Sequence, residues 1–256
     1  MNTKELIFTQ LDTNLVQLTI SRPPANALSG VLIAALSSTL KHLAQQDSPP
    51  GVVLTGDGER FFSAGGDINE VADHELAISR MRDFQDLLCQ IEEYPSPLVC
   101  AVKGYAVGAG FEIVLHSDYI VASPQSRFGF PEINHGLLPA AKGMRQAVAI
   151  LGQRTARYLL CSGSLIFAKD AITAGAIDEI AEVDDVLTRA VLKCRELREK
   201  DSRLFTAIKR TLQKASQMTD VALLDMTLSD LAGYLGDSKS ADARSQFLTR
   251  NKKAKL

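Results

Sequence analysis

The sequence predicts an α/β fold, with a layered core of strands and helices followed by a helical C-terminal region. Up to about residue 180, short apolar runs alternate with longer amphipathic stretches, which predicts strands and helices in turn. From 176 to 232 the chain contains neither glycine nor proline, so long helices are favoured there over tight turns. We therefore expect a core over residues 1–182 and a helical region over 183–256.

The expected strands of the core are short runs of apolar and β-branched residues. The chain contains such runs at 15–20, 52–55, 98–102 and 119–122. Pro95 and Pro97 limit the third of them on its N-terminal side, because the residue before a proline favours extended backbone.

Helices are expected where apolar residues recur with a helical period. The core has two such stretches, 31–44 and 81–91, and on the first of them one face carries Leu32, Leu36, Leu40 and Leu43. The C-terminal region has four, at 186–198, 203–214, 221–231 and 241–250. On the second of these four, one apolar stripe contains Leu204, Ile208 and Leu212. Such a stripe either covers the chain's own sheet or joins an interface between subunits.

Composition restricts the class of protein without naming a function. The 256 residues are 46% hydrophobic and carry a net charge of -2, which permits a large core and gives no reason to expect nucleic acid or an anionic membrane as partner. The four cysteines show no close pairing, and neither they nor the histidines have the spacing of metal ligands. No segment resembles a secretory signal or a membrane span. We expect a cytoplasmic protein without a bound metal.

Two glutamates in loops are the most informative residues. Glu112 follows the glycine-rich segment 108–111 and Glu132 follows Pro131, each beyond one of the expected strands. Adjacent strands could deliver both carboxylates to one edge of a sheet, where desolvation and mutual repulsion would raise a pKa, as acid/base chemistry requires. Taken alone, each glutamate is more simply a helix cap or a partner of a surface arginine.

A third loop strengthens the catalytic interpretation. Residues 61–68 follow the strand at 52–55 and contain the adjacent glycines Gly65 and Gly66, which allow a sharp turn that presents backbone N–H groups to a ligand. Together with the glycine-rich loop before Glu112, this loop could supply two N–H donors to one oxygen.

Four motifs in order, at 22–28, 61–68, 103–112 and 131–139, resemble those of the enoyl-CoA hydratase/isomerase (crotonase) family, and the resemblance spans nearly the whole chain. It implies a crotonase-like fold of repeated ββα units. It also implies C-terminal helices that serve trimerisation, in a homotrimer or a dimer of trimers. The substrate would be an acyl-CoA thioester, and no cofactor would be needed, since coenzyme A is part of the substrate.

The resemblance also implies roles for individual residues. Ala64 and Ala109 would donate the two backbone N–H groups that polarise the thioester carbonyl. Glu112 would activate water for addition at the β-carbon, and Glu132 would exchange the proton at the α-carbon. Arg250 would reach the phosphates of coenzyme A. The remaining contacts to coenzyme A would come from Ala25, Ala27, Leu28, Ala64, Gly65, Gly66, Asp67, Ile68 and Ala109.

The expected activity is that of an enoyl-CoA hydratase or dehydratase. An isomerase of the same fold would need Glu132 but could dispense with Glu112, and a non-catalytic acyl-CoA-binding or RNA-binding protein is the more distant alternative. A dinucleotide fingerprint is excluded because its third glycine would fall at Ile113. Lys142 stands where the family usually has glycine, so it either binds a polar or carboxylated acyl group or points to solvent.

Overall fold

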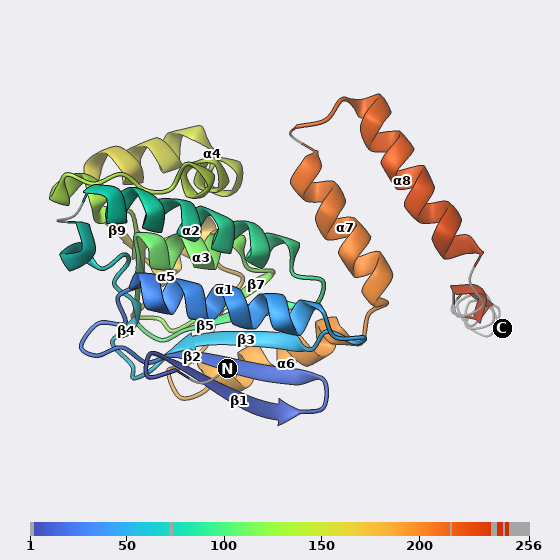
Figure 1. Cartoon of the computed structure of the whole chain (residues 1–256), viewed down its shortest axis with the longest axis horizontal. Helices are drawn as coiled ribbons and strands as arrows, with labels where there is room; N and C mark the ends of the chain where they lie inside the picture. Colours follow the sequence, from blue (N-terminus) through green and yellow to red (C-terminus); the bar gives the residue numbers. More distant parts are fainter. Residues whose placement is uncertain (1–2, 72–73, 216, 237–239, 243, 246–256) are drawn as a thin grey trace. The chain divides into compact units, whose positions relative to one another are not determined.

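The computed structural model describes residues 3–71, 74–215, 217–236, 240–242 and 244–245 (Figure 1). The chain divides into two compact units, Met1–Glu199 and Lys200–Leu256. Both β-sheets belong to the first unit. No helix within the described residues is both long enough and apolar enough to cross a membrane.

The larger sheet has six strands, in the spatial order β1 (Leu6–Asp12), β2 (Leu15–Ile20), β3 (Gly51–Gly56), β5 (Leu98–Val102), β7 (Tyr119–Ala122) and β10 (Glu179–Ile180). β1 runs antiparallel to β2, whereas all the other neighbours are parallel. The four strands expected from the sequence are confirmed as β2, β3, β5 and β7. They form the contiguous centre of the sheet, where both faces are buried and apolar runs are favoured.

A second sheet of short strands was not expected from the sequence. Its four strands are β4 (Phe61–Ser63), β6 (Tyr105–Val107), β8 (Arg127–Gly129) and β9 (Leu165–Phe167). β4, β6 and β8 are parallel neighbours, so their carboxyl ends share one edge of this sheet. The loops that leave these three strands therefore begin side by side.

Each of these three short strands stands between a strand of the larger sheet and a helix. The helices that follow them are α2 (His74–Glu93), α3 (Ala109–His116) and α4 (Ala141–Ser162). The chain thus repeats a ββα unit three times, as β3-β4-α2, β5-β6-α3 and β7-β8-α4, which confirms the crotonase-like architecture. Short 3₁₀ helices, Ile68–Val71 and Pro131–His135, precede α2 and α4.

Helix α1 (Gly30–Ala44) packs over one face of the larger sheet (Figure 1). Its first turn is capped by the Ser29 hydroxyl, which accepts a hydrogen bond from the N–H of Leu32 at 3.1 Å. The expected apolar face is confirmed, since its four leucines are all buried. They join one hydrophobic core with residues of α2, α3 and α4.

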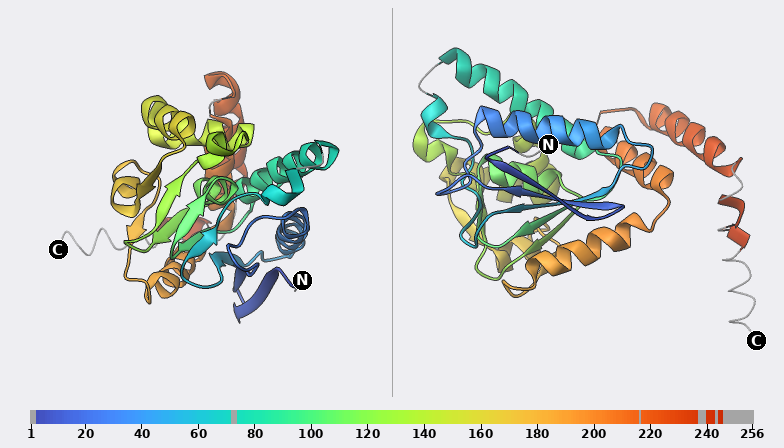
Figure 2. Two further views of the ribbon diagram at one scale, coloured as in Figure 1. Left: turned by 90° about the vertical axis from the view of Figure 1, so that its left-hand side faces the viewer. Right: turned by 60° about the horizontal axis from the view of Figure 1, so that its bottom comes forward.

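Helix α6 (Val186–Arg198) covers the opposite face of the same sheet, as the two orientations of Figures 1 and 2 show. Val186, Ala190 and Cys194 are buried against residues of β3 and β5, including Val53 and Val99. The first unit therefore extends to Glu199, beyond the boundary expected at 182/183. A short helix, α5 (Ala168–Thr173), precedes β10.

The second unit consists, within the described residues, mainly of α7 (Ser202–Lys214) and α8 (Asp220–Leu235). Both helices were expected, and each begins at a side-chain cap, Asp201 for α7 and Thr219 for α8. Neither helix has a buried residue. The helix expected at 241–250 lies largely outside the described residues, and Arg250 lies wholly outside them.

Candidate active site

The loops that follow β4 and β6 are in direct backbone contact. Gly65 has a φ of +94° and Gly108 has a φ of +56°, conformations that favour glycine. A Cβ atom on Gly65 would lie 3.0 Å from the carbonyl oxygen of Val107, and one on Gly108 would lie 3.6 Å from the Cα of Gly65. A side chain at position 65 would press on the second loop, and the positive φ would strain any other residue at either position.

A cavity of about 640 Å³ opens beside this contact. It is lined by every expected site residue within the described part of the chain, which are Ala25, Ala27, Leu28, Ala64, Gly65, Gly66, Asp67, Ile68, Ala109, Glu112 and Glu132. Helix α2 supplies further apolar lining through Met81 and Phe84, which the sequence analysis did not assign. The amphipathic pattern of the helix could indicate a buried face there, but not that this face would line a cavity.

Glu112 is only 1% exposed although it carries a carboxyl group. It stands in the first turn of α3, and its Oε1 accepts a hydrogen bond from the N–H of Ala140 at 3.2 Å. Its Oε2 is buried and has no hydrogen-bond partner within the described residues. Burial raises the pKa of Glu112 to about 8, and the charge of Glu132 raises it further, while the bond from Ala140 opposes the shift.

Glu132 belongs to the 3₁₀ helix Pro131–His135 and lines the same cavity as Glu112. Its carboxylate lies close to the backbone of Gly108. A Cβ atom at position 108 would lie 2.7 Å from Glu132 Oε1. Among the described residues nothing bonds to its buried Oε2. Burial raises the pKa of Glu132 to about 7. The structure therefore brings two carboxyl groups to one cavity, each with an unpaired oxygen and a pKa near neutrality.

The expected role of Ala64 as a hydrogen-bond donor to substrate is contradicted. Its N–H already donates to the carbonyl of Ala25 at 3.0 Å. Within the described residues the N–H of Gly66 donates to no protein acceptor, and neither does the N–H of Ala109, the first residue of α3. The left-handed conformation of Gly65, which no single sequence reveals, turns the chain so that position 66, not 64, has the free donor.

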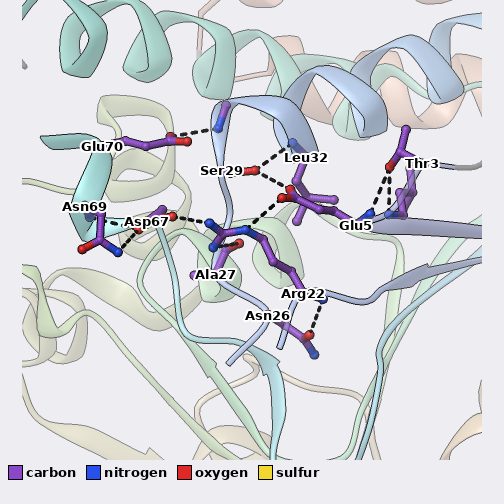
Figure 3. A network of polar contacts seen from close by, with 12 residues as sticks. Thr3, Glu5, Arg22, Asn26, Ala27, Ser29, Leu32, Asp67, Asn69 and Glu70 are labelled. Carbon is purple, nitrogen blue, oxygen red and sulfur yellow. Dashed lines mark hydrogen bonds and ion pairs between the residues drawn. The ribbon is translucent and has the colours of Figure 1, made fainter. Parts of the chain in front are cut away.

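An ion-pair network fixes the loop that carries Gly66 (Figure 3). Arg22 pairs with Asp67 at 2.5 Å and with Glu5 at 3.1 Å. Glu5 also accepts a hydrogen bond from the hydroxyl of Ser29, the cap of α1. The backbone adds two bonds to Leu28, one from its N–H to the carbonyl of Gly65 and one from the N–H of Asp67 to its carbonyl. The segment 64–67 is therefore held from both sides.

Lys142 takes neither of its two expected positions. Its ammonium group pairs with Glu92 of α2, and its side chain is 10% exposed, so it does not point to solvent. It is not among the residues that line the cavity. The partner lies fifty positions earlier in the sequence, on another helix, and could not be identified from the residues around Lys142.

No group of three His, Cys, Asp or Glu side chains in the described part of the chain is arranged to hold a metal ion. Glu112 and Glu132 can perform acid/base catalysis. They lie beside the N–H groups of Gly66 and Ala109, which could stabilise an oxyanion.

Comparison with known proteins assigns the family. The family model described as enoyl-CoA hydratase/isomerase matches residues 10–254. The 2,3-dehydroadipyl-CoA hydratase of Escherichia coli is 34% identical over 202 residues, which cover 78% of this chain and 79% of that protein.

Solved structures agree. A crystal structure of an enoyl-CoA hydratase from Polaromonas sp. JS666 matches with a TM-score of 0.89 and 26% identity, over 96% of this chain and 97% of that chain. The structure of Pseudomonas aeruginosa DspI, at 24% identity, matches in fold with a TM-score of 0.92 over 98% of this chain and 96% of that chain. From the extent of the family match, the chain belongs to the enoyl-CoA hydratase/isomerase family of enzymes.

Proposed function

We propose that this protein catalyses the reversible addition of water across the α,β double bond of an enoyl-CoA thioester. The observation that carries the proposal is the pair Glu112 and Glu132, whose buried, unpaired carboxyl oxygens face one cavity beside two free N–H groups. The name of the relative from Escherichia coli supports a thioester with a 2,3 double bond as the substrate.

The thioester oxygen would accept hydrogen bonds from the N–H groups of Gly66 and Ala109. Addition of water places negative charge on this oxygen, and a fixed donor in a site shielded from water contributes about 3 kcal/mol to the stability of that charge. The network around Arg22 and Asp67 holds the Gly66 donor in place before substrate binds. No reorganisation would then be needed as the charge develops.

The two carboxyl groups would divide the proton transfers. In the reactive form the single proton of the pair lies on Glu132, which is the minor arrangement because Glu112 has the higher pKa. Ionised Glu112 then takes a proton from water as the water oxygen bonds to the β-carbon, and the electrons of the double bond move onto the thioester as an enolate. Protonated Glu132 then gives its proton to the α-carbon, and the carbonyl re-forms. After one turnover Glu112 has gained a proton from water and Glu132 has lost one to the product, so Glu112 must release a proton to solvent and Glu132 must take one up before the next turnover. The proposal requires neither a metal nor a redox cofactor.

A hydratase accounts for both carboxylates, whereas a double-bond isomerase needs only one proton carrier at the α-carbon. Glu112→Gln and Glu132→Gln should each reduce hydration by several powers of ten, with combined losses that are not additive because the groups act as a unit. Glu59→Gln, at an exposed glutamate, is the control and should leave the rate unchanged. If Glu112→Gln retained most of a double-bond shift that Glu132→Gln abolished, the enzyme would be an isomerase.

We further propose that α7 and α8 join subunits in a homotrimer or a dimer of trimers. Their exposed apolar residues support this, since Leu212 is 72% exposed and Val221 is 70% exposed, and an apolar surface of this kind is normally covered. Sedimentation at micromolar concentration tests the assembly. A monomer would contradict it without affecting the proposed chemistry.

A further inference from the structure

The N-terminus of α4 has no side-chain cap, as is also the case for α3, α5 and α6. Its cap position is Ala140, whose side chain has no polar atom, and alanine is among the poorer residues at such a position. Yet this turn requires accurate placement, because the N–H of Ala140 bonds to Glu112 and the backbone of Gly143 packs on the same carboxylate. Contacts other than a side-chain cap must therefore hold the first turn of α4 in place.

Helix α2 provides two bonds to this turn, both at Lys142. The N–H of Lys142 donates to Oε1 of Gln85 at 3.2 Å, and its ammonium group pairs with Glu92. Gln85 and Glu92 are seven positions apart and therefore lie on the same face of α2. One residue of α4 is thus fixed to α2 through both its backbone and its side chain.

The pair Glu92–Lys142 is well shielded from solvent. The side chain of Lys142 is 10% exposed and that of Glu92 is 14% exposed. Removal of one partner from a shielded pair leaves an uncompensated charge, which is costly. The titratable groups near the pair include Cys89 of α2, whose thiol pKa is raised chiefly by burial, and His116 of α3, whose pKa is lowered to about 4 chiefly by burial. Asp86 and Glu93 of α2 lie near Cys89, and Arg145 of α4 lies near His116. His116 is therefore neutral near pH 7 and does not compete for Glu92.

We propose that Lys142 is a positioning residue for Glu112: its ion pair with Glu92 and its hydrogen bond to Gln85 hold the first turn of α4 against the Glu112 carboxylate. The inference rests on the proposed function for its effect on turnover, but its effect on Glu112 itself does not. It also assigns Lys142 no part in the recognition of the acyl group.

Lys142→Met and Glu92→Gln test the inference, with the exposed Lys169→Met as the control. Each of the first two should reduce kcat about 10-fold or more for every enoyl-CoA that the wild type accepts, with little change in KM, since a displacement of 1 Å can cost about 10²-fold. Lys169→Met should have no effect. The swapped pair, Glu92→Lys with Lys142→Glu, should recover much of the loss. Circular dichroism checks that each variant is folded, and Lys142→Gln, which removes the charge but keeps a polar side chain, replaces Lys142→Met if that variant is not.

A second readout does not depend on turnover. The titration of the Glu112 carboxyl group can be followed by infrared difference spectroscopy, with Glu112→Gln to identify its band. Loss of the bond from Ala140 disfavours the ionised form, so Lys142→Met should move the titration midpoint of Glu112 to higher pH. If the wild type turned over no thioester while this midpoint still moved, the proposed function would fail and the positioning role would stand.

Two results would overturn the inference. In the first, the wild type is active, and both Lys142→Met and Glu92→Gln keep its kcat and the midpoint of Glu112. In the second, Lys142→Met raises KM for carboxylated acyl-CoA substrates alone, which would make Lys142 an acyl-recognition residue after all.

Discussion

The backbone of Gly143 lies directly against the carboxylate of Glu112. A Cβ atom at position 143 would be 1.7 Å from Glu112 Oε2, far inside any tolerated contact. The first turn of α4 therefore packs against Oε2 of Glu112, and the N–H of Ala140 donates a hydrogen bond to Oε1 of the same carboxyl group. The site of proposed water activation thus depends on α4 as much as on α3.

Gly143→Ala should reduce hydration by about 10²-fold or more, because Glu112 or α4 must move by more than 1 Å to admit the methyl group. The control is Gly233→Ala in α8, where a new Cβ would meet nothing within 4 Å. That variant should keep full activity and be as stable as the wild type or up to about 1 kcal/mol more stable, since alanine favours helix. Steady-state kinetics and thermal unfolding measure both effects. Full activity in Gly143→Ala would contradict this account of the site.

Activity should show a bell-shaped dependence on pH. The pKa values of Glu132 and Glu112, about 7 and about 8, describe the pair, which holds a single proton between them. Below about pH 7 both carboxyl groups are protonated and no base remains, and above about pH 8 both are ionised and no acid remains. The measurement is kcat/KM from pH 5 to pH 10, about the range that covers both limbs. A flat profile through the window would show that these groups do not carry the protons.

Glu112→Gln should stabilise the protein at alkaline pH although it removes activity. The folded-state pKa of Glu112 is raised from 4.5 to about 8, so burial of this group favours folding fully below pH 4.5, and that benefit is lost as the pH rises toward 8. A neutral amide of the same shape avoids the cost of burying a charge. Denaturant unfolding at several pH values should show the variant gaining stability relative to the wild type as pH rises. A constant difference would argue against a raised pKa.

Substitutions at Gly66 separate the backbone donor from the side chain. Gly66→Pro removes the N–H group and should lower kcat by about 10²-fold or more. Gly66→Ala keeps the N–H, and its Cβ would lie 3.2 Å from the guanidinium group of Arg80, so a shift of that side chain by a few tenths of an ångström would admit the methyl group and a small effect is expected. Equal losses in the two variants would show that the N–H of Gly66 is not the essential feature. Binding of a CoA thioester, measured in parallel, reports any distortion of the loop.

The strands that the sequence predicted are those that lie at the centre of the larger sheet, such as β5, because burial on both faces demands continuous apolar runs. The three-residue strands β4, β6 and β8 carry too little periodicity to be recognised, yet it is they that align the loops of Gly66, Gly108 and Glu132. Sequence analysis could therefore identify both glutamates without placing the loops between them.

The two errors in the expected site have physical causes. The choice of Ala64 over Gly66 depended on the direction of one N–H group, which is set by the left-handed φ of Gly65. The interpretation of Lys142 depended on a partner, Glu92, from a distant part of the chain. A motif specifies residue types at a spacing, but it does not specify which of their polar groups are already bonded.

The proposed hydration can be tested through the product formed from an enoyl-CoA in deuterated water. The proposed mechanism predicts a 3-hydroxyacyl-CoA with one non-exchanging deuteron at the α-carbon, detected by mass spectrometry and nuclear magnetic resonance, and neither label nor hydroxyl group when both glutamates are replaced by glutamine. A product with a shifted double bond and no added water, or a failure of the wild type to transform any enoyl-CoA tested, would contradict it.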